Sequence, residues 1–295
     1  MMNELTLTGD VQGTLLTPAR RSGLGVVVMA GSSGRVDVAR AALFAATGAM
    51  ALALRWFGGH GQVPGICEVP LETFFAAIDR LSREGCQRIA LVGTSKGAEA
   101  ALLTAVHDPR VDAVMAISPS SIVWANIGPG RDGVAWPPRS SWTLGGVPLA
   151  FVAHDPDWQR EYRDGLISYR SQHEHSMRRF ASEMAAATIP VEAARASIIL
   201  VAGGDDALWP SAMFATSVAD RLATFGKTAR LVLHPEAGHR VLLPGETTPR
   251  SALHAHGGND QADGELGQAA WNAMLPLLQL PPPGSKDCAP AVPPA

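Results

Sequence analysis

The chain alternates between short apolar runs typical of strands and segments whose apolar residues recur at helical spacing, and this alternation constrains the fold most. Residues 24–29 read LGVVVM, a continuous run typical of a strand buried on both faces. Residues 36–47 have apolar residues at helical spacing, and Gly48 stands where a helix commonly ends. We predict an antiparallel pair within residues 1–16, further strands over 49–56, 88–92, 111–117, 198–202 and 229–234, and further helices over 71–81, 97–106, 210–225 and 265–278. This order predicts an α/β fold with a mostly parallel central sheet and helices on both faces.

One long segment interrupts the alternation. Residues 119–196 separate two predicted strands, and a connection of this length is too long for a plain loop. Its first part is rich in Gly, Pro, Ser and Trp, whereas residues 158–187 carry many charges and are predicted to form one or two helices. We predict that this insertion is a cap over the carboxyl edge of the sheet, within a single domain spanning residues 1–280. Residues 281–295 are Pro-rich, which predicts a disordered tail.

Composition excludes several classes of protein. With 46% hydrophobic and 17% charged residues among 295, the chain is typical of a globular protein, and its net charge of −3 argues against nucleic-acid binding through bulk basic charge. Cys67, Cys86 and Cys288 lie far apart and form no C-x-x-C pair, which argues against a zinc ribbon and fits a reducing compartment. The N-terminal residues do not have the pattern of a signal peptide. No apolar run reaches the ~18 residues that a membrane-spanning helix needs. We predict a cytoplasmic protein that acts on a small molecule without a metal or other cofactor and binds no membrane.

Residues 93–97 read G-T-S-K-G, a G-x-S-x-G pentapeptide between the predicted strand RIALV and the predicted helix AEAALLTAV. The pentapeptide alone is a weak signal, but a strand–turn–helix setting is the one that a nucleophile elbow requires. In such an elbow the glycines allow a sharp turn with close backbone contacts, and the turn lifts the serine hydroxyl above the edge of the sheet. The sequence therefore predicts Ser95 as a catalytic nucleophile.

A serine nucleophile needs an adjacent base, and in this kind of fold the acid and the histidine follow the serine in that order. Asp205 and Asp206 come directly after the strand SIILVA, and His239 follows the next strand. The acid usually stands three residues after a glycine and four before a proline, so Gly203 and Pro210 favour Asp206. Asp205 is then a loop carboxylate or a helix cap.

The remaining candidates concern the oxyanion hole, the other histidines and the cap. Backbone N–H groups of Lys96 and of Ser32, with Ser33 as the alternative, are predicted to bind the oxyanion. The pair His173/His175 is a poor metal-ligand pattern, because residues two apart on a helix do not share a face. The pair His254/His256 lies in a predicted loop and has no carboxylates nearby at ligand spacing. Four tryptophans of the cap could line an acyl pocket, although ordinary packing is favoured for any one of them: Trp124, Trp136, Trp142 and Trp158.

Several stretches resemble the catalytic domain shared by acyl-CoA thioesterases and bile acid-CoA:amino acid N-acyltransferases. They include VPLETFFAAIDRL, GTSKGAEAAL, DDALWPS and HPEAGHRVLLP, and the combination of DDALWPS with PEAGH is far more specific than the pentapeptide. The resemblance runs over about residues 24–278. It implies the α/β-hydrolase fold, a triad of Ser95, Asp206 and His239, and acyl transfer from a thioester, usually to water.

The chain also departs from the pattern of this family. Longer members carry an N-terminal β-sandwich domain, whereas few residues precede Leu24 here, and Arg35 stands where a glycine is common. The branch that conjugates amino acids tends to use cysteine as nucleophile, so Ser95 favours hydrolysis. We therefore expect a thioesterase that acts on acyl-CoA or a carrier-bound acyl group. The alternatives are a carboxylesterase or lactonase, an acyltransferase, an acyl-eliminating biosynthetic enzyme, or a non-catalytic binding protein.

Overall fold

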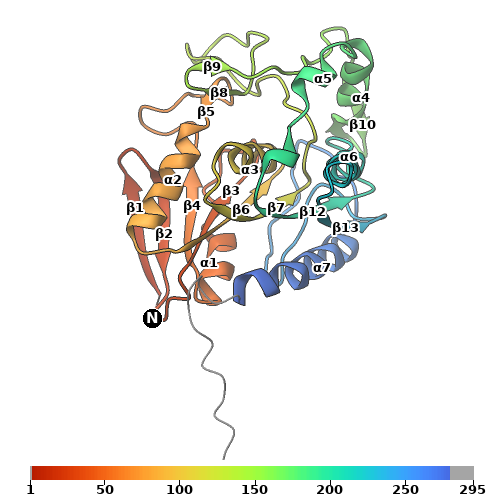
Figure 1. Cartoon of the computed structure of the whole chain (residues 1–295). Coiled ribbons are helices and arrows are strands. Elements are labelled where there is room, and N and C mark those ends of the chain that lie inside the picture. Colours follow the sequence, from red (N-terminus) through yellow and green to blue (C-terminus); the bar gives the residue numbers. More distant parts are fainter. Residues whose placement is uncertain (1, 280–295) are drawn as a thin grey trace, which may run out of the picture.

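The computed structural model describes residues 2–279 and is built around an eight-stranded sheet in the order β1-β2-β4-β3-β6-β7-β12-β13 (Figure 1). Only β2 runs antiparallel to its neighbours, so the sheet is mostly parallel, as predicted. The predicted tail at 281–295 and Cys288 lie outside the described residues. The strands are β1 (Asn3–Thr8), β2 (Gln12–Thr17), β3 (Leu24–Met29), β4 (Met50–Arg55), β6 (Arg88–Thr94), β7 (Val111–Ile117), β12 (Ser197–Gly203) and β13 (Ala229–His234).

Helices cover both faces of this sheet (Figure 1). One face packs against α1 (Val38–Ala46) and α7 (Asp260–Gln279), and the other against α2 (Glu72–Arg83), α3 (Lys96–His107) and α6 (Ser211–Thr224). Alternate residues of each strand point to opposite faces of the sheet. In β3, Val26 and Val28 face α1 and α7, whereas Val27 faces the other helices. Burial on both faces explains why these strands read as continuous apolar runs.

The C-terminal helix begins five residues earlier than its apolar pattern predicts. Asn259 caps it, because the Asn259 side-chain oxygen accepts a hydrogen bond from the N–H of Ala262 at 3.0 Å. Asp260 and Asp263 in the first turn add negative charge at the positive end of the helix. Polar capping residues therefore extend the helix beyond its apolar stripe.

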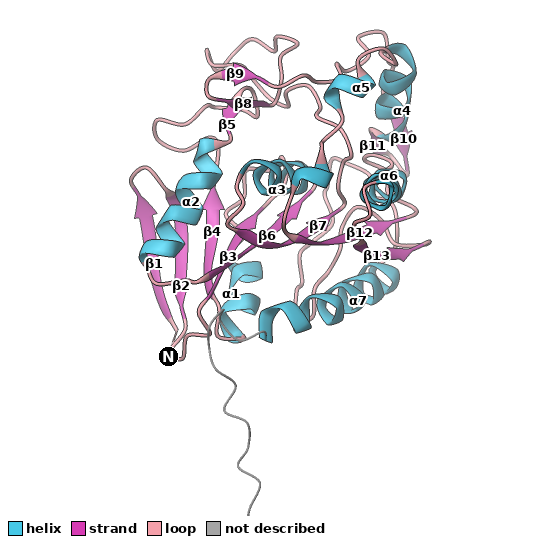
Figure 2. Ribbon diagram, viewed as in Figure 1, coloured by secondary structure: helices cyan, strands magenta, loops and turns pink. Residues whose placement is uncertain are grey.

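Most of segment 119–196 lies at the top and upper right of the view in Figure 2, and the segment contains small elements only. β8 pairs with β5 (Val69–Pro70), which precedes α2 in the chain. The elements are β8 (Trp142–Leu144), β9 (Val147–Pro148), β10 (Glu161–Arg163), β11 (Leu166–Ser168), α4 (Arg170–Arg179), α5 (Met184–Ala187) and the 3-10 helix Val191–Ala193.

The prediction of helix throughout residues 158–187 was wrong in its first part. β10 and β11 form an antiparallel hairpin there, and α4 begins only at Arg170. The cause is the turn Asp164-Gly165, in which both residues have positive φ (51° and 76°). Asp-Gly is a preferred dipeptide for this tight hairpin turn, and it outweighs the high charge of the flanking residues.

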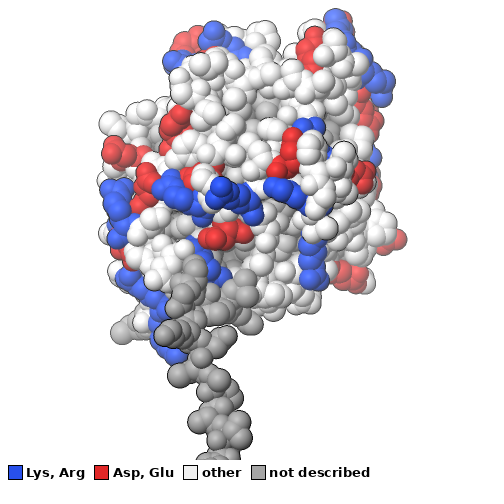
Figure 3. Space-filling view, viewed as in Figure 1, with Lys and Arg blue, Asp and Glu red and all other residues white. Residues whose placement is uncertain are grey.

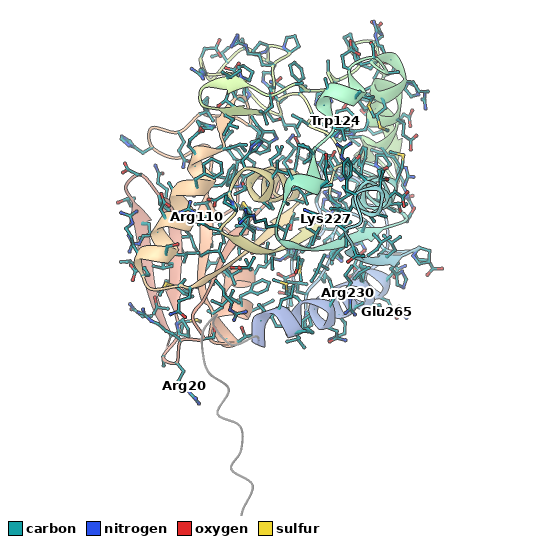
Figure 4. The ribbon with its side chains drawn as sticks, in the orientation of Figure 1. Arg20, Arg110, Trp124, Lys227, Arg230 and Glu265 are labelled. Atoms are coloured by element: carbon teal, nitrogen blue, oxygen red, sulfur yellow. The ribbon has the colours of Figure 1, made fainter. Side chains whose placement is uncertain are left out.

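Lys and Arg side chains form a band across the middle of the face shown in Figure 3. Arg110 and Lys227, both labelled in Figure 4, lie at this level. Arg110 pairs with Asp108 and Asp79, and the ammonium of Lys227 donates to two backbone carbonyls. These two cations of the band are thus paired with other groups of the protein itself. Within residues 2–279, none of the helices has the length and apolar character needed to cross a bilayer.

Candidate active site

Ser95 stands at a strained turn between β6 and α3. Its φ of 57° and ψ of −120° are unusual for a residue other than glycine. The turn needs glycine on both sides, because a Cβ at Gly93 would lie 2.1 Å from the carbonyl oxygen of Gly97. A Cβ at Gly97 would lie 2.5 Å from the carbonyl oxygens of Met29 and Ala30. Strain of this kind concentrates at functional sites, where the surrounding structure maintains it.

Asp206 and His239 are joined by a hydrogen bond in the interior. Nδ1 of His239 lies 2.7 Å from Oδ2 of Asp206, and both residues are buried. The other carboxylate oxygen, Oδ1, accepts hydrogen bonds from the N–H groups of Leu208 (2.8 Å) and Trp209 (3.2 Å). These two bonds fix the carboxylate plane, so Oδ2 faces the imidazole.

Asp205 has a different role, although it is adjacent in sequence. Its carboxylate forms two hydrogen bonds with Arg163 of β10, at 2.8 and 2.7 Å, and accepts another from the N–H of Gly258. The Arg163 guanidinium holds the pKa of Asp205 below its usual value. Asp205 therefore attaches the β10–β11 hairpin to this loop, and Asp206 is the partner of His239.

Ser95 and His239 line one cleft of about 440 Å³, together with Ser32 and Ser33. The loop that carries these two serines approaches the elbow closely, because a Cβ at Gly31 would lie 3.6 Å from Oγ of Ser95. Lys96 begins α3, and the first amides of a helix have no acceptor within that helix. The cleft thus brings the predicted nucleophile, base and oxyanion-binding loop to one place.

The side chain of Lys96 points into the protein and forms an ion pair that the sequence analysis missed. Its ammonium lies 2.7 Å from Oε2 of Glu99, and both side chains are at most 1% exposed. Burial lowers the pKa of Lys96, and Glu99 opposes that shift. Oε1 of Glu99 accepts hydrogen bonds from the N–H of Trp124 (3.1 Å) and from Nε1 of Trp142 (2.6 Å). Glu99 therefore links the first turn of α3 to two parts of segment 119–196. The i,i+3 spacing of Lys and Glu was its sequence signal.

A second buried ion pair contacts the residue before Ser95. Arg40 of α1 forms two hydrogen bonds with the carboxylate of Glu246, each 2.7 Å long, and donates to Oγ1 of Thr94 at 2.7 Å. Arg40 and Thr94 both line the cleft. Because 206 positions separate Arg40 from Glu246, no local pattern could have predicted this pair.

The four tryptophans do not line this cleft, and they differ in exposure. Trp124, labelled in Figure 4, and Trp142 are fully buried, whereas Trp136 is 68% exposed. Trp158 is half-buried and donates from Nε1 to the hydroxyl of Ser171. Within residues 2–279, no group of three or more His, Cys, Asp or Glu residues is arranged to hold a metal ion.

Two histidines beside Trp124, the half-buried His154 and the buried His173, predict acid sensitivity of the fold. Burial is the main cause that lowers the pKa of His154 to about 3 and that of His173 to about 4, with Lys96 contributing to both shifts. Unfolding restores each pKa to about 6.5, so below that pH the unfolded chain binds protons that the folded chain does not. Their contribution to stability is therefore complete above about pH 6.5 and falls as the pH falls toward about 4.

Urea unfolding between about pH 6.5 and 4.5 tests this prediction. His154→Phe keeps a ring stacked on Trp124, where the two rings now lie 5.8 Å apart and nearly parallel. The slope of unfolding free energy against pH should decrease by about 1.4 kcal/mol per pH unit relative to wild type. An unchanged slope would contradict the assignment of a neutral His154 in the folded chain.

Comparisons with known proteins place the chain in a family. A family model described as BAAT / Acyl-CoA thioester hydrolase C terminal matches residues 69–279. The chain is 26% identical to acyl-coenzyme A thioesterase 6 of Mus musculus over 288 residues, which cover 92% of this chain and 63% of the relative. It is 27% identical to acyl-coenzyme A amino acid N-acyltransferase 1 of Mus musculus over 241 residues, covering 80% of this chain and 53% of that protein. The chain thus spans less than two thirds of the length of these relatives.

A solved structure shows the fold. Est1E from Butyrivibrio proteoclasticus with ferulic acid bound superposes with a TM-score of 0.52 at 14% identity, covering 94% of this chain and 98% of that one. Together with the mostly parallel sheet and its flanking helices, this likeness identifies the α/β-hydrolase fold.

Proposed function

Since the chain belongs to the family of the BAAT / acyl-CoA thioester hydrolase C-terminal domain, we propose that it hydrolyses acyl thioesters through Ser95, Asp206 and His239. The observation that carries this proposal is the 2.7 Å hydrogen bond between His239 and a fully buried Asp206. His239 opens onto the same cleft as Ser95 at its strained elbow. A carboxylate that holds an imidazole beside a serine is the arrangement needed to activate a hydroxyl nucleophile.

The reaction proceeds in two halves. His239 takes the proton of Ser95 as Oγ attacks the thioester carbonyl, and Asp206 holds the imidazole in the correct tautomer and stabilises the imidazolium. The negative oxygen of the tetrahedral intermediate is bound by the backbone N–H groups of Lys96 and Ser32. His239 then protonates the leaving sulfur, which leaves an acyl ester on Ser95. Water enters, gives a proton to His239, and releases the acid and free Ser95.

Similarity to both hydrolases and acyltransferases makes the thioester the common substrate feature. The thioesterase and N-acyltransferase relatives are both named for coenzyme A chemistry, and they differ in what receives the acyl group. Water is the acceptor in this proposal, because a serine ester of the kind formed on Ser95 is readily hydrolysed by the same histidine. The acyl group is thus drawn from coenzyme A or another thiol carrier.

A panel of acyl-CoA thioesters of different chain lengths tests the proposal, with released thiol measured by a chromogenic reagent. The matching oxygen esters are run beside them, and an amine is added in a parallel series. We expect thiol release that prefers thioester to oxygen ester, yields free acid with or without amine, and disappears in Ser95→Ala. Faster turnover of oxygen esters would instead indicate a carboxylesterase, and amide formation an acyltransferase.

A further inference from the structure

The second His-x-His motif of the sequence lies in a short strap, residues 254–258 (HAHGG), beside the site. The carbonyl oxygen of His256 accepts hydrogen bonds from the N–H groups of Ala207 (3.3 Å) and His239 (2.8 Å). One carbonyl group therefore joins the loop that carries Asp206 to the loop that carries His239.

The two glycines of the strap hold its backbone in a fixed position. Gly257 and Gly258 have φ values of +68° and +63°, which other residues rarely adopt. A Cβ at Gly257 would lie 1.7 Å from the carbonyl oxygen of Asp205, and one at Gly258 would lie 2.1 Å from the backbone nitrogen of Gly238. Backbone packed this closely leaves little room for the strap to move, so the backbone that carries His256 is held in place.

The His256 ring faces the reacting groups. It lines the same cleft as Ser95, and its centroid lies 6.1 Å from that of the His239 ring. Nδ1 is shielded from solvent and has no hydrogen-bond partner among residues 2–279. Because the ring lines the cleft while Nδ1 is shielded, Nε2 is the nitrogen that remains to bind a molecule held in the cleft.

Burial, together with the balance of nearby charges, keeps the His256 ring neutral. Burial, and after it the charge of His239, lowers the pKa of His256 to about 4. Asp206 opposes this shift, whereas Arg240 and Arg250 reinforce it. A neutral imidazole has one N–H donor and one acceptor nitrogen, so it can hold a water molecule without competing for the proton that His239 receives.

His256 also stands where the cleft continues outward. A second cleft of about 500 Å³ shares Arg250, Ser251, His254 and His256 with the first and extends to the β10–β11 hairpin at Arg163 and Leu166. In a serine hydrolase, the leaving atom takes a proton from the histidine and the incoming water gives one to it, so both stand next to that ring. Here that ring is His239, and His256 is its neighbour.

We propose that His256 is a further catalytic residue, which hydrogen-bonds the water that attacks the acyl-enzyme. This inference rests on the proposed function. One O–H of the water donates to His239 and the other donates to the acceptor nitrogen of His256. As the water oxygen bonds to the acyl carbon, its first proton passes to His239. The bond from the acyl carbon to Oγ of Ser95 then breaks, and that proton moves to Oγ. His256 orients the water and exchanges no proton.

The test separates deacylation from formation of the site. p-Nitrophenyl acetate is used as substrate. The acetyl-enzyme that it forms is hydrolysed by water, independently of which leaving group the enzyme prefers in its own substrates. His256→Phe removes the hydrogen bond, and His256→Gln retains a donor and an acceptor. His175→Gln, on the exposed side of α4, is the matched control. A fluorophosphonate probe is used separately to label Ser95, a reaction that needs no attacking water.

We expect His256→Phe to release a burst of about one nitrophenol per chain and then to turn over about tenfold more slowly than wild type, as expected for one lost hydrogen bond. His256→Gln should stay within about threefold of wild type, and His175→Gln should equal it. All variants should react with the probe at the wild-type rate.

Unchanged turnover in His256→Phe would overturn the inference. So would an equally slow His256→Gln, or slower labelling in proportion to slower turnover. If even the wild-type chain neither takes the probe on Ser95 nor releases nitrophenol, the proposed function itself fails, and this inference with it.

Discussion

Replacement of Asp206 by Asn is expected to lower kcat by about four orders of magnitude with little change in KM. In the wild-type chain, the N–H groups of Leu208 and Trp209 bind Oδ1, and Oδ2 faces Nδ1 of His239. In the variant, the same two N–H groups would bind the oxygen of the introduced amide, which turns the amide NH₂ toward His239. That NH₂ can only donate, so the imidazole must carry its proton on the nitrogen that faces Ser95. In this tautomer His239 cannot accept the proton of Ser95.

Asp205→Asn provides the matched control one residue away. This change weakens the ion pair with Arg163, whose side chain is 45% exposed. Surface ion pairs of this kind contribute little, so kcat should change by less than about tenfold. Steady-state kinetics of both variants on one thioester decide the matter. Equal losses in the two variants, or more than about a tenth of wild-type kcat in Asp206→Asn, would contradict the assignment of the acid.

The second large effect is expected on stability, from Glu99→Gln. The change leaves the ammonium of Lys96, which is 1% exposed, without a counter-charge. Removal of one partner of a buried ion pair typically costs about 3–5 kcal/mol, because the remaining charge stays away from water. We expect a loss of that size in urea unfolding at neutral pH, with a lower Tm. Two further variants serve as controls.

Glu84→Gln breaks an i,i+4 pair with Arg80 in which both side chains are about one third exposed, so its effect should not exceed about 0.5 kcal/mol. The double variant Lys96→Met, Glu99→Gln removes both charges, while the amide oxygen can still accept from Trp124 and Trp142. It should therefore be more stable than Glu99→Gln alone. A loss below about 1 kcal/mol in Glu99→Gln, or a double variant that is no more stable than Glu99→Gln alone, would contradict this role of the buried pair.

The strands and helices could be predicted from the sequence wherever the pattern of apolar residues reflects which side chains are buried. Runs such as LGVVVM identify strands covered on both faces, and helical spacing locates the layers that cover them. The pattern was less informative in segment 119–196, where the elements are two to ten residues long. There, local turn chemistry at Asp164-Gly165 decided the structure, and high charge had suggested a helix instead.

The arrangement of the candidate site was also predictable in part, while its catalytic role stays a proposal. The order of Ser95, Asp206 and His239 along the chain, each after a strand, anticipated which residues the sheet edge brings together. The choice between Asp205 and Asp206 depended on usual spacing, and hydrogen bonds now separate their roles. The contact of His256 with two loops involves backbone groups, whose partners leave no mark on side-chain identity.

The central claim is that Ser95 is the nucleophile in thioester hydrolysis, and titration of the chain with a fluorophosphonate probe tests it most directly. Acyl-CoA hydrolysis is measured on the same samples, and the modified residue is identified by peptide mass spectrometry. The account predicts one adduct per chain, located on Ser95, and thiol release that falls in proportion to the fraction labelled. Thiol release that continues when Ser95 is fully labelled would contradict it, as would inactivation with the adduct on another residue.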